Sequence, residues 1–491
     1  MRVQSSLLAL TLCLSGCSQS DTLTAIDRLK PCATADGPVD AYCGTLTVYE
    51  NRESRQGRTI DLKIILLPAL GNEPKPDPLF FLAGGPGQGA AEMARPLKEV
   101  FRRVQADRDI VLVDQRGTGK SHPLDCESDQ DSLATINEPL ETAMNRLREC
   151  ADGLDADLRL YTTTIAMDDL NDVREFLGYD RINLYGGSYG TRAALVYLRQ
   201  HEPTVRSVIL DGVAPPDMRL PLFMARDGQR ALDRLLADCE SNDACREKFP
   251  QLSTRLRTLV TGLDAAPAKV RLTHPRTGVA EDVSVDGEFI VNVLFGALYS
   301  PLTSTLLPEL ITRAERHDFQ GLLALAMANE GAASNMAIGM QMSVVCAEDF
   351  PRITQDQIAR EAEATVFGTH LLTSRMEICK FWPRGDVAPS FYEPVKSTVP
   401  VLVLSGELDP VTPPEWGDSV LPHLPNSRHI VVPATGHGAI STGCGMRILQ
   451  AFIETASFDA LDTGCLEVLK RPPFFLSPAG PDPAGSKGAG R

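Results

Sequence analysis

The chain has 491 residues, of which 64 are acidic and 48 are basic, so its formal net charge is −16. This negative balance argues against nucleic acid as a partner and against a basic surface that binds membrane lipids. Apolar residues make up 43% of the chain, which is enough for a large buried core. The length suits one large domain with an insertion, or about two to three domains.

The N-terminus has the features of an export signal. Arg2 supplies a positive charge, and the apolar stretch Leu7–Leu14 is too short to span a bilayer. The sequence Leu14-Ser15-Gly16-Cys17 resembles the bacterial lipobox, in which the cysteine becomes the lipidated first residue. We therefore predict a lipoprotein signal over residues 1–17 and an anchor at Cys17 on the periplasmic side of the outer membrane. An ordinary cleaved signal, and hence secretion, is the alternative.

Cysteine usage agrees with export. Of twelve cysteines, Cys13 leaves with the signal and Cys17 carries lipid, so an even number remains. An oxidising compartment favours disulfides, and the absence of a C-x-x-C pair argues against a metal site. We predict that each cysteine pairs with its neighbour in the sequence: Cys32–Cys43, Cys126–Cys150, Cys239–Cys245, Cys346–Cys379 and Cys444–Cys465.

Short apolar runs alternate with helical stretches over residues 32–214 and again over residues 398–470. Their continuous hydrophobicity indicates strands buried on both faces, and hence a mostly parallel central sheet flanked by helices. The first two strands, near Leu46–Tyr49 and Ile60–Leu67, are predicted to form an antiparallel edge. A helix is predicted over Thr163–Leu177. The apolar runs are Ile64–Leu67, Leu79–Leu82, Ile110–Val113, Ile182–Tyr185, Val208–Leu210, Val401–Leu404 and Ile430–Val432.

Residues 215–397, between these two parts of the predicted core, lack the regularly spaced apolar runs that predict strands. Helical patterns replace them, and we predict an inserted helical cap over the strand ends, where open α/β sheets bind ligands. From residue 471 to residue 491 small residues and prolines dominate, which predicts a flexible tail. The helical patterns of the cap cover Ala225–Ala237, Phe289–Leu298, Ile311–Asn329 and Thr354–Ala364.

The sequence Gly186-Gly187-Ser188-Tyr189-Gly190 lies between a predicted strand and the helical stretch Thr191–Gln200. This is the layout of a nucleophile elbow, in which a serine occupies a strained turn between small neighbours. The turn holds the hydroxyl clear of the sheet. Ser188 is therefore the candidate nucleophile.

A serine needs a histidine to take its proton and an acid to orient that histidine. In α/β hydrolases both follow the serine in the chain, the acid first. Asp409 lies in the loop after the strand Val399–Leu404 and is the candidate acid, with Glu407 as the alternative. His437 stands between two glycines in the loop after the next strand and is the candidate base. Other histidines, such as His429 at a strand start, are expected on the surface.

A glycine-rich loop, Ala83-Gly84-Gly85-Pro86-Gly87, directly follows another predicted strand. The backbone N–H groups of Gly84, Gly85 and Tyr189 are candidates for an oxyanion hole, because donors there can stabilise the anion that develops during acyl transfer. The loop lacks the G-x-G-x-x-G spacing of a dinucleotide site. The segment Gly117–Ser121 resembles the end of a Walker A loop, but Asp114 replaces the earlier glycine. We expect no nucleotide, no other cofactor and no metal.

Together these motifs resemble those of the proline iminopeptidases, and more closely those of the exported tripeptidyl-aminopeptidase-like branch of that serine-peptidase family. The resemblance implies an α/β-hydrolase fold with a large inserted helical cap. It also implies removal of one to three residues from peptides with a free N-terminus. Proline iminopeptidases usually have a histidine where this chain has Ala83, which weakens a strict preference for proline. The motifs are Gly84–Gly87, Asp114–Ser121, Gly186–Gly190 and the loops of Asp409 and His437.

An exopeptidase must hold a protonated α-amino group, and in this family the cap supplies carboxylates for it. The sequence Val344–Asp349 resembles the cap motif, so the resemblance makes Glu348 and Asp349 candidates for that role. A solvated acidic pair beside a disulfide is the alternative. Asp114 and Arg116 are expected to brace the loop over the site. A carboxylesterase with the same catalytic residues is the alternative function.

Overall fold

A computed structural model describes residues 24–34, 40–126, 133, 136, 138–333 and 336–481 of the chain. The predicted signal over residues 1–17 and the lipidation at Cys17 lie outside the described residues. Within the described part, no helix is long and apolar enough to cross a membrane.

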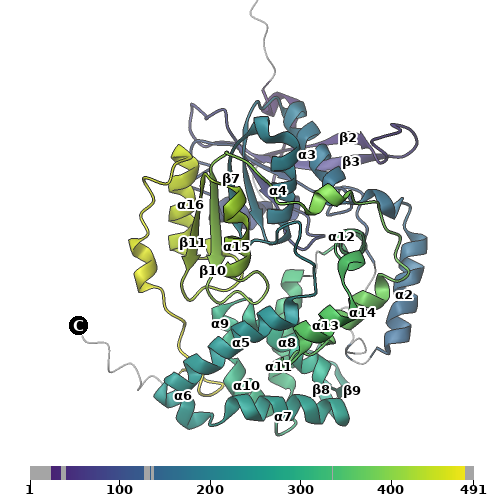
Figure 1. Cartoon of the computed structure of the whole chain (residues 1–491), viewed down its shortest axis with the longest axis vertical. Coiled ribbons are helices and arrows are strands. Elements are labelled where there is room, and N and C mark those ends of the chain that lie inside the picture. The colour runs from purple at the N-terminus through teal and green to yellow at the C-terminus, as the bar shows by residue number, and fades with distance from the viewer. Residues whose placement is uncertain are drawn as a thin grey trace, which may run out of the picture.

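A twisted central sheet forms the upper half of the molecule (Figure 1). In the described residues it has nine strands, in the order β1-β2-β3-β5-β4-β6-β7-β10-β11. The strands from β5 to β11 are parallel, whereas β1, β2 and β3 form the predicted antiparallel edge. The strands are β1 (Lys30–Cys32), β2 (Ala41–Tyr49), β3 (Thr59–Leu67), β4 (Leu79–Leu82), β5 (Ile110–Val113), β6 (Ile182–Gly187), β7 (Val205–Asp211), β10 (Val401–Gly406) and β11 (Ser427–Val432).

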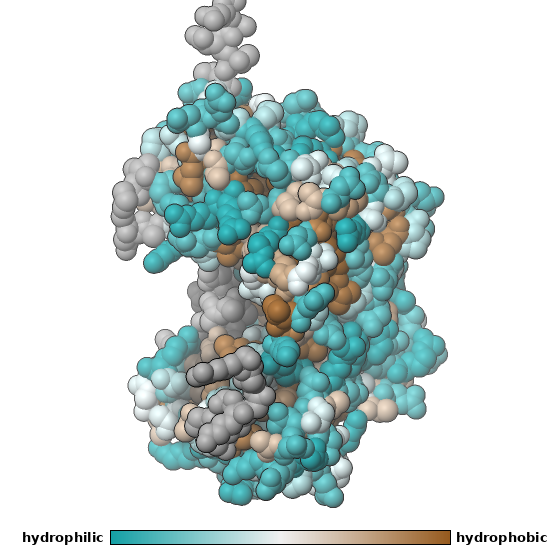
Figure 2. All heavy atoms as spheres, turned by 90° about the vertical axis from the view of Figure 1, so that its left-hand side faces the viewer, coloured by the Kyte–Doolittle hydropathy of each residue, from teal (hydrophilic) through white to brown (hydrophobic). Residues whose placement is uncertain are grey.

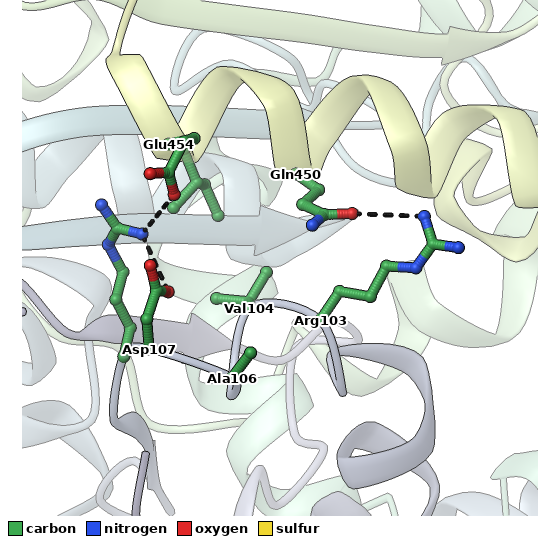
Figure 3. Close-up of a pocket in the computed structure, with 8 residues that line it drawn as sticks. Arg103, Val104, Ala106, Asp107, Gln450 and Glu454 are labelled. Atoms are coloured by element: carbon green, nitrogen blue, oxygen red, sulfur yellow. Dashed lines mark hydrogen bonds and ion pairs between the residues drawn. The ribbon is translucent and has the colours of Figure 1, made fainter. Parts of the chain in front are cut away.

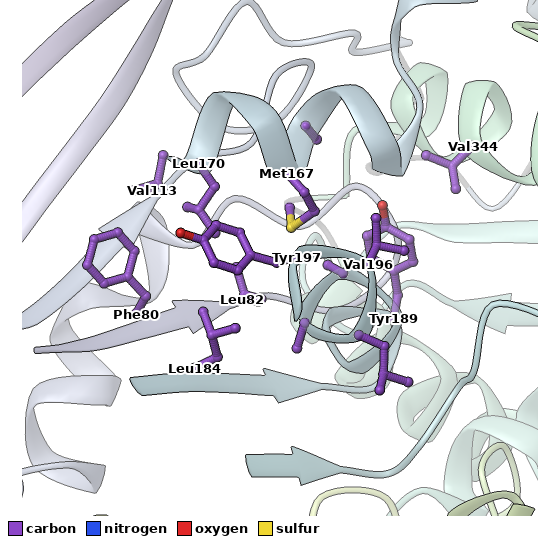
Figure 4. Close-up of a cluster of buried hydrophobic side chains, with 14 of the residues drawn as sticks. Phe80, Leu82, Val113, Met167, Leu170, Leu184, Tyr189, Val196, Tyr197 and Val344 are labelled. Carbon is purple, nitrogen blue, oxygen red and sulfur yellow. The ribbon is translucent and has the colours of Figure 1, made fainter. Parts of the chain in front are cut away.

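Helices cover both faces of this sheet, as the continuous apolar runs predict. Along β4, Phe80 and Leu82 face one apolar cluster, which Figure 4 shows beneath α3 and α4, while Leu79 and Phe81 face a second cluster. Because alternate side chains of a strand point to opposite faces, both faces must be apolar. The helices around the sheet are α1 (Ala94–Val100), α3 (Thr163–Leu177), α4 (Tyr189–His201), α15 (Pro414–Val420) and α16 (Gly443–Thr455), whereas α2 (Leu140–Gly153) lies beside the cap (Figure 1).

The helix predicted over Thr163–Leu177 is present as α3. It ends at Gly178, whose φ of +80° lies in the left-handed region. A residue in this conformation lets its N–H satisfy the last carbonyls of the helix, and glycine adopts it without a steric penalty.

The lower half of Figure 1 is the cap, which has an apolar cluster of its own. The cap is mostly helical, and it also contains a feature that the sequence analysis did not predict, an antiparallel hairpin of β8 (Ala268–Thr273) and β9 (Ala280–Val285). Figure 2 shows apolar residues reaching the surface at the level where cap and core meet. The cap helices are α5 (Met224–Ser241), α6 (Asp243–Lys248), α7 (Leu252–Ala265), α8 (Gly287–Leu298), α9 (Pro301–Ser304), α10 (Leu307–Ala314), α11 (Gln320–Ala333), α12 (Ile338–Glu348), α13 (Gln355–Ala362) and α14 (His370–Ile378).

The single helix predicted over Ile311–Asn329 is wrong, since α10 ends at Ala314 and α11 begins at Gln320. His317 between them has a φ of +61°, which is incompatible with a continuing helix. The Asp318 carboxylate turns back to pair with Arg313 at 2.6 Å, which holds the two helices at this corner.

Two segments pack elsewhere than the predicted domain boundaries imply. Helix α12 packs its Met340 and Val344 into the apolar cluster of the core, although it belongs to the cap in sequence. The other segment is residues 471–481, which the sequence analysis assigned to a flexible tail and which instead belong to the described structure. Phe474 is buried in the apolar cluster of the cap, and the N–H of Phe475 donates to the carbonyl of Thr305.

The disulfide prediction is confirmed for all five pairs, whose Cα atoms lie between 5.0 and 5.8 Å apart. Four of them close short loops within one segment. The pair Cys346–Cys379 joins the end of α12 to the residue after α14, and so it ties together two helices that border both core and cap.

Candidate active site

Ser188 forms the turn between β6 and α4, with φ 57° and ψ −125°. Positive φ is strained for a residue with a side chain, and this strain is typical of a nucleophile elbow. Glycine is required two residues before and two residues after Ser188. A Cβ on Gly186 would lie 2.2 Å from the carbonyl oxygen of Gly190, and a Cβ on Gly190 would lie 2.2 Å from that of Leu82. The close approach of strand and helix therefore depends on both glycines.

The candidate acid, Asp409, and the candidate base, His437, are in contact, as predicted. Nδ1 of His437 lies 2.7 Å from Oδ2 of Asp409, whose side chain is fully buried. The other oxygen of Asp409 accepts the N–H groups of Val411 and Thr412, at 2.8 and 2.9 Å. Glu407, the alternative acid, instead accepts from the N–H of Ala434 and pairs with Arg234. Asp409 is therefore the residue that can orient the histidine.

This pairing changes the pKa of both groups. Burial alone would lower the pKa of His437, but the charge and hydrogen bond of Asp409, with a further contribution from Asp211, outweigh it and raise the pKa. Burial alone would raise the pKa of Asp409, yet His437 and the two backbone N–H groups lower it. The aspartate therefore stays ionised and stabilises an imidazolium, as a serine hydrolase requires.

The strand end of β7 brings the serine and the histidine together. The N–H of Ser188 donates to the carbonyl of Asp211 at 2.9 Å. At the next residue, a Cβ on Gly212 would lie 3.2 Å from Cε1 of His437. Within the described residues, no hydrogen bond joins the Ser188 hydroxyl to the His437 ring. Such bonds are often long in a resting enzyme and tighten when substrate binds.

The predicted oxyanion loop lies against the nucleophile. A Cβ on Gly84 would be 3.2 Å from Cβ of Ser188, so the backbone passes directly beside the serine. Tyr189 is the first residue of α4, and its N–H therefore has no acceptor within its own helix. Next to Gly84, Gly85 has a φ of +110°, and a Cβ there would lie 2.7 Å from Sδ of Met336. The loop is thus pressed between the elbow and the segment that leads into α12.

Asp114 and Arg116 have the bracing contacts expected of them. One oxygen of Asp114 accepts the N–H of Ala91 at 2.7 Å and the other accepts that of Lys120 at 2.9 Å. Arg116 is buried and pairs with Asp169 at 2.6 Å. These bonds fix the loops behind the oxyanion loop and do not face the reacting atoms.

Glu348 and Asp349 are fully buried, and their oxygens are engaged within the protein. Both pair with Arg192, at 3.3 and 3.0 Å, and Glu348 also accepts the N–H and hydroxyl of Thr163. Burial raises the pKa of Glu348 to about 7, although the charge of Arg192 opposes this. These contacts do not favour the predicted binding of a substrate amine. They favour a brace for α4, on which Arg192 lies four residues after the nucleophile.

Three residues in contact with the triad were missed in the sequence. The hydroxyl of Thr412 lies 2.9 Å from Oδ2 of Asp409 and 3.1 Å from Nδ1 of His437, so it steadies their contact. The carboxylate of Asp211 accepts the N–H groups of Ala439 and Ile440, just after the histidine. Their positions in the sequence offered a signal for both, because Thr412 follows Asp409 by three residues and Asp211 directly follows the predicted strand Val208–Leu210.

The third missed residue, Tyr299, comes from the cap. Its carbonyl accepts the N–H of His437 at 2.9 Å, and its ring stands edge-on to the imidazole with 5.2 Å between ring centroids. The residue is nevertheless 37% exposed, so solvent reaches the space beside the histidine. Nothing in the sequence marks Tyr299, because only the packing of cap on core brings it there.

A second serine, histidine and aspartate make contact nearby. Nε2 of His429 lies 2.9 Å from the hydroxyl of Ser405, and Nδ1 lies 2.8 Å from Asp418. The side chain of His429 is only 7% exposed, which corrects its expected place on the surface. Ser405 is fully buried in β10, so no substrate can reach it. The same three residue types therefore form a structural link here and not a catalytic one.

A pocket of about 190 Å³ lies between α16 and the segment after α1 (Figure 3). None of its lining residues belongs to the triad or to the oxyanion loop. Among its charged side chains, Arg108 pairs with Asp77 and Glu454 at 2.9 and 3.1 Å, and Arg103 donates to the amide oxygen of Gln450 at 3.5 Å. The pocket does not contribute to the candidate active site.

Comparisons with known proteins agree with this geometry. A family model described as alpha/beta hydrolase fold matches residues 77–264, and one described as TAP-like protein matches residues 364–465. The serine protease Hip1 of Mycobacterium tuberculosis is 26% identical over 437 residues, which cover 83% of each chain. The tripeptidyl aminopeptidase of Streptomyces coelicolor is 25% identical over 462 residues, or 87% of this chain and 83% of the relative.

A shorter match agrees as well. The proline iminopeptidase of Neisseria gonorrhoeae is 31% identical over 138 residues, which cover 28% of this chain and 32% of the relative. The resemblance expected from the motifs is confirmed by these relatives. We conclude that the chain has an α/β-hydrolase fold and the site of a serine hydrolase, and that it is similar to a serine protease and to aminopeptidases.

Proposed function

We propose that this protein is an exported serine exopeptidase that releases fragments of one to three residues from the free N-terminus of peptides. The observation that carries the proposal is the meeting of three distant loops at one edge of the sheet, which sets the Asp409–His437 pair beside the Ser188 elbow. The aminopeptidase relatives and the TAP-like match support the choice of peptides as substrates.

The arrangement supports acyl transfer in two steps. His437 takes the proton of the Ser188 hydroxyl as it attacks the scissile carbonyl, and Asp409 stabilises the imidazolium that forms. The N–H of Tyr189, with those of Gly84 or Gly85, faces the oxygen that becomes an anion. His437 then gives its proton to the leaving amine. Water, deprotonated by the same histidine, hydrolyses the acyl-enzyme and restores the serine.

Export is supported by the five disulfides and by the predicted signal over residues 1–17. We propose that Cys17 carries the lipid that holds the protein at the periplasmic side of the outer membrane, where it meets peptides. A Cys17→Ala variant is expected in the soluble periplasmic or secreted fraction, whereas the natural chain is expected in the membrane fraction.

The proposed activity is tested with pairs of chromogenic peptides that differ only in acetylation of the N-terminus. An enzyme that reads the free amine is expected to cleave the free peptide and to lose the acetylated one. A carboxylesterase with the same triad would instead cleave simple esters and ignore the state of the amine. Equal hydrolysis of free and acetylated peptides would reject the exopeptidase.

The nucleophile is tested in the same assay. We expect Ser188→Ala to lower kcat by about 10⁶ and to abolish labelling by a fluorophosphonate probe. Ser405→Ala is the matched control, because Ser405 also contacts a histidine but is fully buried; this variant should keep its labelling. A loss of less than tenfold for Ser188→Ala would mean that another residue is the nucleophile.

A further inference from the structure

Helix α12 contacts both sources of the proposed oxyanion donors. Directly before the helix, the N–H of Ala337 donates to the carbonyl of Gly87 at 3.0 Å, in the glycine-rich loop. A Cβ on Gly87 would lie 2.7 Å from the carbonyl oxygen of Ala337, so the two backbones touch. The last residue of the helix, Glu348, contacts the starts of α3 and α4. One helix therefore links the glycine-rich loop to the helix that begins at Tyr189.

Glu348 reaches Tyr189 through a threonine. The two oxygens of its carboxylate accept the N–H of Thr163 at 2.7 Å and the hydroxyl of Thr163 at 3.0 Å. That hydroxyl lies 2.7 Å from the hydroxyl of Tyr189, and all three side chains are buried. Because the Thr163 hydroxyl has one proton and gives it to the carboxylate, the Tyr189 hydroxyl donates to Thr163. The three side chains therefore form one chain of hydrogen bonds that ends on the proposed oxyanion donor.

Arg192 provides a second link between Glu348 and the start of α4. Tyr189 and Arg192 are three residues apart, so they lie on one face of the helix. The guanidinium of Arg192 pairs with Glu348 at 3.3 Å and with Asp349 at 3.0 Å, and these three side chains are fully buried. In Figure 4, Tyr189 lies on the side of the apolar cluster where Val344 of α12 packs. The end of α12 thus holds the first turn of α4 at two points.

The position of this turn matters because an oxyanion hole acts through its geometry. Its N–H groups must lie about 2.7–3.1 Å from the oxygen that becomes an anion. A misplacement of about 1 Å can cost about 100-fold in rate. Ser188, directly before Tyr189, has a strained φ of 57°, and such strain persists only where the surrounding structure holds it. The contacts at the end of α12 supply that support.

We propose that Glu348 is a positioning residue for acyl transfer, which fixes the N–H of Tyr189 in the oxyanion hole through Thr163 and Arg192. The proposal rests on the oxyanion donors of the proposed function, and it is independent of which acyl compound is cleaved. Because α12 also touches the glycine-rich loop, one helix of the cap sets the separation of the two sources of donors. This role differs from the binding of a substrate amine that the sequence predicts for Glu348.

Tyr189→Phe removes the hydroxyl at the end of the chain and keeps the buried ring. We expect the rate of labelling by a fluorophosphonate probe to fall about tenfold, because the phosphonyl oxygen occupies the oxyanion hole as the adduct forms. For a cleaved peptide, kcat should fall by the same factor while KM changes by less than about twofold. Tyr197→Phe is the matched control and should keep both rates. It also removes a buried hydroxyl from α4, but that hydroxyl contacts Asn171 and Thr204.

Glu348→Gln tests the other end of the chain. The amide keeps the size of the side chain but loses the charge that Arg192 and Thr163 bind, so labelling should again slow by about tenfold or more. Tyr189→Phe/Glu348→Gln should lose clearly less than the product of the two single losses, because both substitutions break the same chain. Melting temperatures show which variants are folded. If Glu348→Gln does not fold, Thr163→Val replaces it in the cycle, since it removes only the connecting hydroxyl.

A site for the substrate amine predicts a different pattern. Glu348→Gln would then raise KM for peptides with a free N-terminus and leave labelling by the probe unchanged. That pattern, or labelling of Tyr189→Phe at the natural rate, would overturn the proposal, as would losses that multiply fully in the double variant. Slow labelling of Tyr189→Phe in a chain that cleaves no peptide would retain the positioning role and reject the exopeptidase.

Discussion

The Asp409 carboxylate makes the largest contribution to the raised pKa of His437, the candidate catalytic base. Asp409 lies 2.7 Å from His437 and raises its pKa above the ordinary value of 6.5, in spite of the burial that would lower it. His437 must be neutral to accept the serine proton, so activity is lost as pH falls through this raised pKa. We expect the acidic limb of kcat/KM to lie above pH 6.5.

Asp409→Asn tests this prediction. The amide cannot stabilise the imidazolium, and it allows the wrong tautomer of the ring, so kcat should fall by about 10⁴. The limb of the remaining activity should move to lower pH, because the group that raises the histidine pKa is gone. Glu407→Gln is the control, since Glu407 binds Ala434 and Arg234 and not the histidine. A profile that is identical in Asp409→Asn would contradict the assignment.

At the scale of elements, β7 does more than fill the centre of the sheet. Its last residue, Asp211, accepts the N–H of Ser188 with its carbonyl and those of Ala439 and Ile440 with its carboxylate. One strand end therefore fixes the position of both the nucleophile elbow and the histidine loop. The Asp211 carboxylate also contributes to the raised pKa of His437.

Asp211→Asn keeps the shape of the side chain but removes its charge and one acceptor. We expect kcat/KM to fall by about 10- to 100-fold, as for the loss of a hydrogen bond to a charged group. The acidic limb should also move to lower pH, which a purely structural defect would not cause. Asp61→Asn, at the exposed edge of the sheet, is the control. A lower melting temperature with an unchanged pH profile would limit Asp211 to a structural role.

Elements built on local patterns could be predicted, and those built on distant packing could not. The strands followed from continuous apolar runs, and α3 followed from its spacing and from Gly178. The hairpin of β8 and β9 was missed because only a short alternating pattern marks it within a block of helices. The break at His317 lacks the glycine or proline that usually ends a helix.

For the candidate active site too, residues marked by a local pattern could be predicted and residues placed by distant packing could not. Ser188, Asp409 and His437 could be named because each lies in a loop directly after a strand, in the order that the fold requires. Tyr299 could not, since it reaches the site only through the way the cap packs on the core. Glu348 and Asp349 were identified as a pair, but the sequence did not reveal that Arg192 lies between them.

For the molecule as a whole, the Cys346–Cys379 disulfide is a covalent link between α12 and the residue after α14. Both cysteines are buried in the apolar cluster of the core, and they close a loop with a sequence separation of 33. Closing such a loop restricts the unfolded chain and stabilises the fold by about 3–4 kcal/mol. The shorter loop of Cys239–Cys245, with a separation of 6, should contribute about 2 kcal/mol.

Replacing both cysteines of a pair by alanine tests this order. The Cys346→Ala/Cys379→Ala protein should unfold at lower urea concentration than Cys239→Ala/Cys245→Ala, and both should unfold before the natural chain. Trp382 reports on the transition, because it is buried three residues after Cys379 and donates to the hydroxyl of Ser343 at 3.1 Å. Equal urea midpoints for the two variants would contradict the view that the longer loop stabilises the fold more.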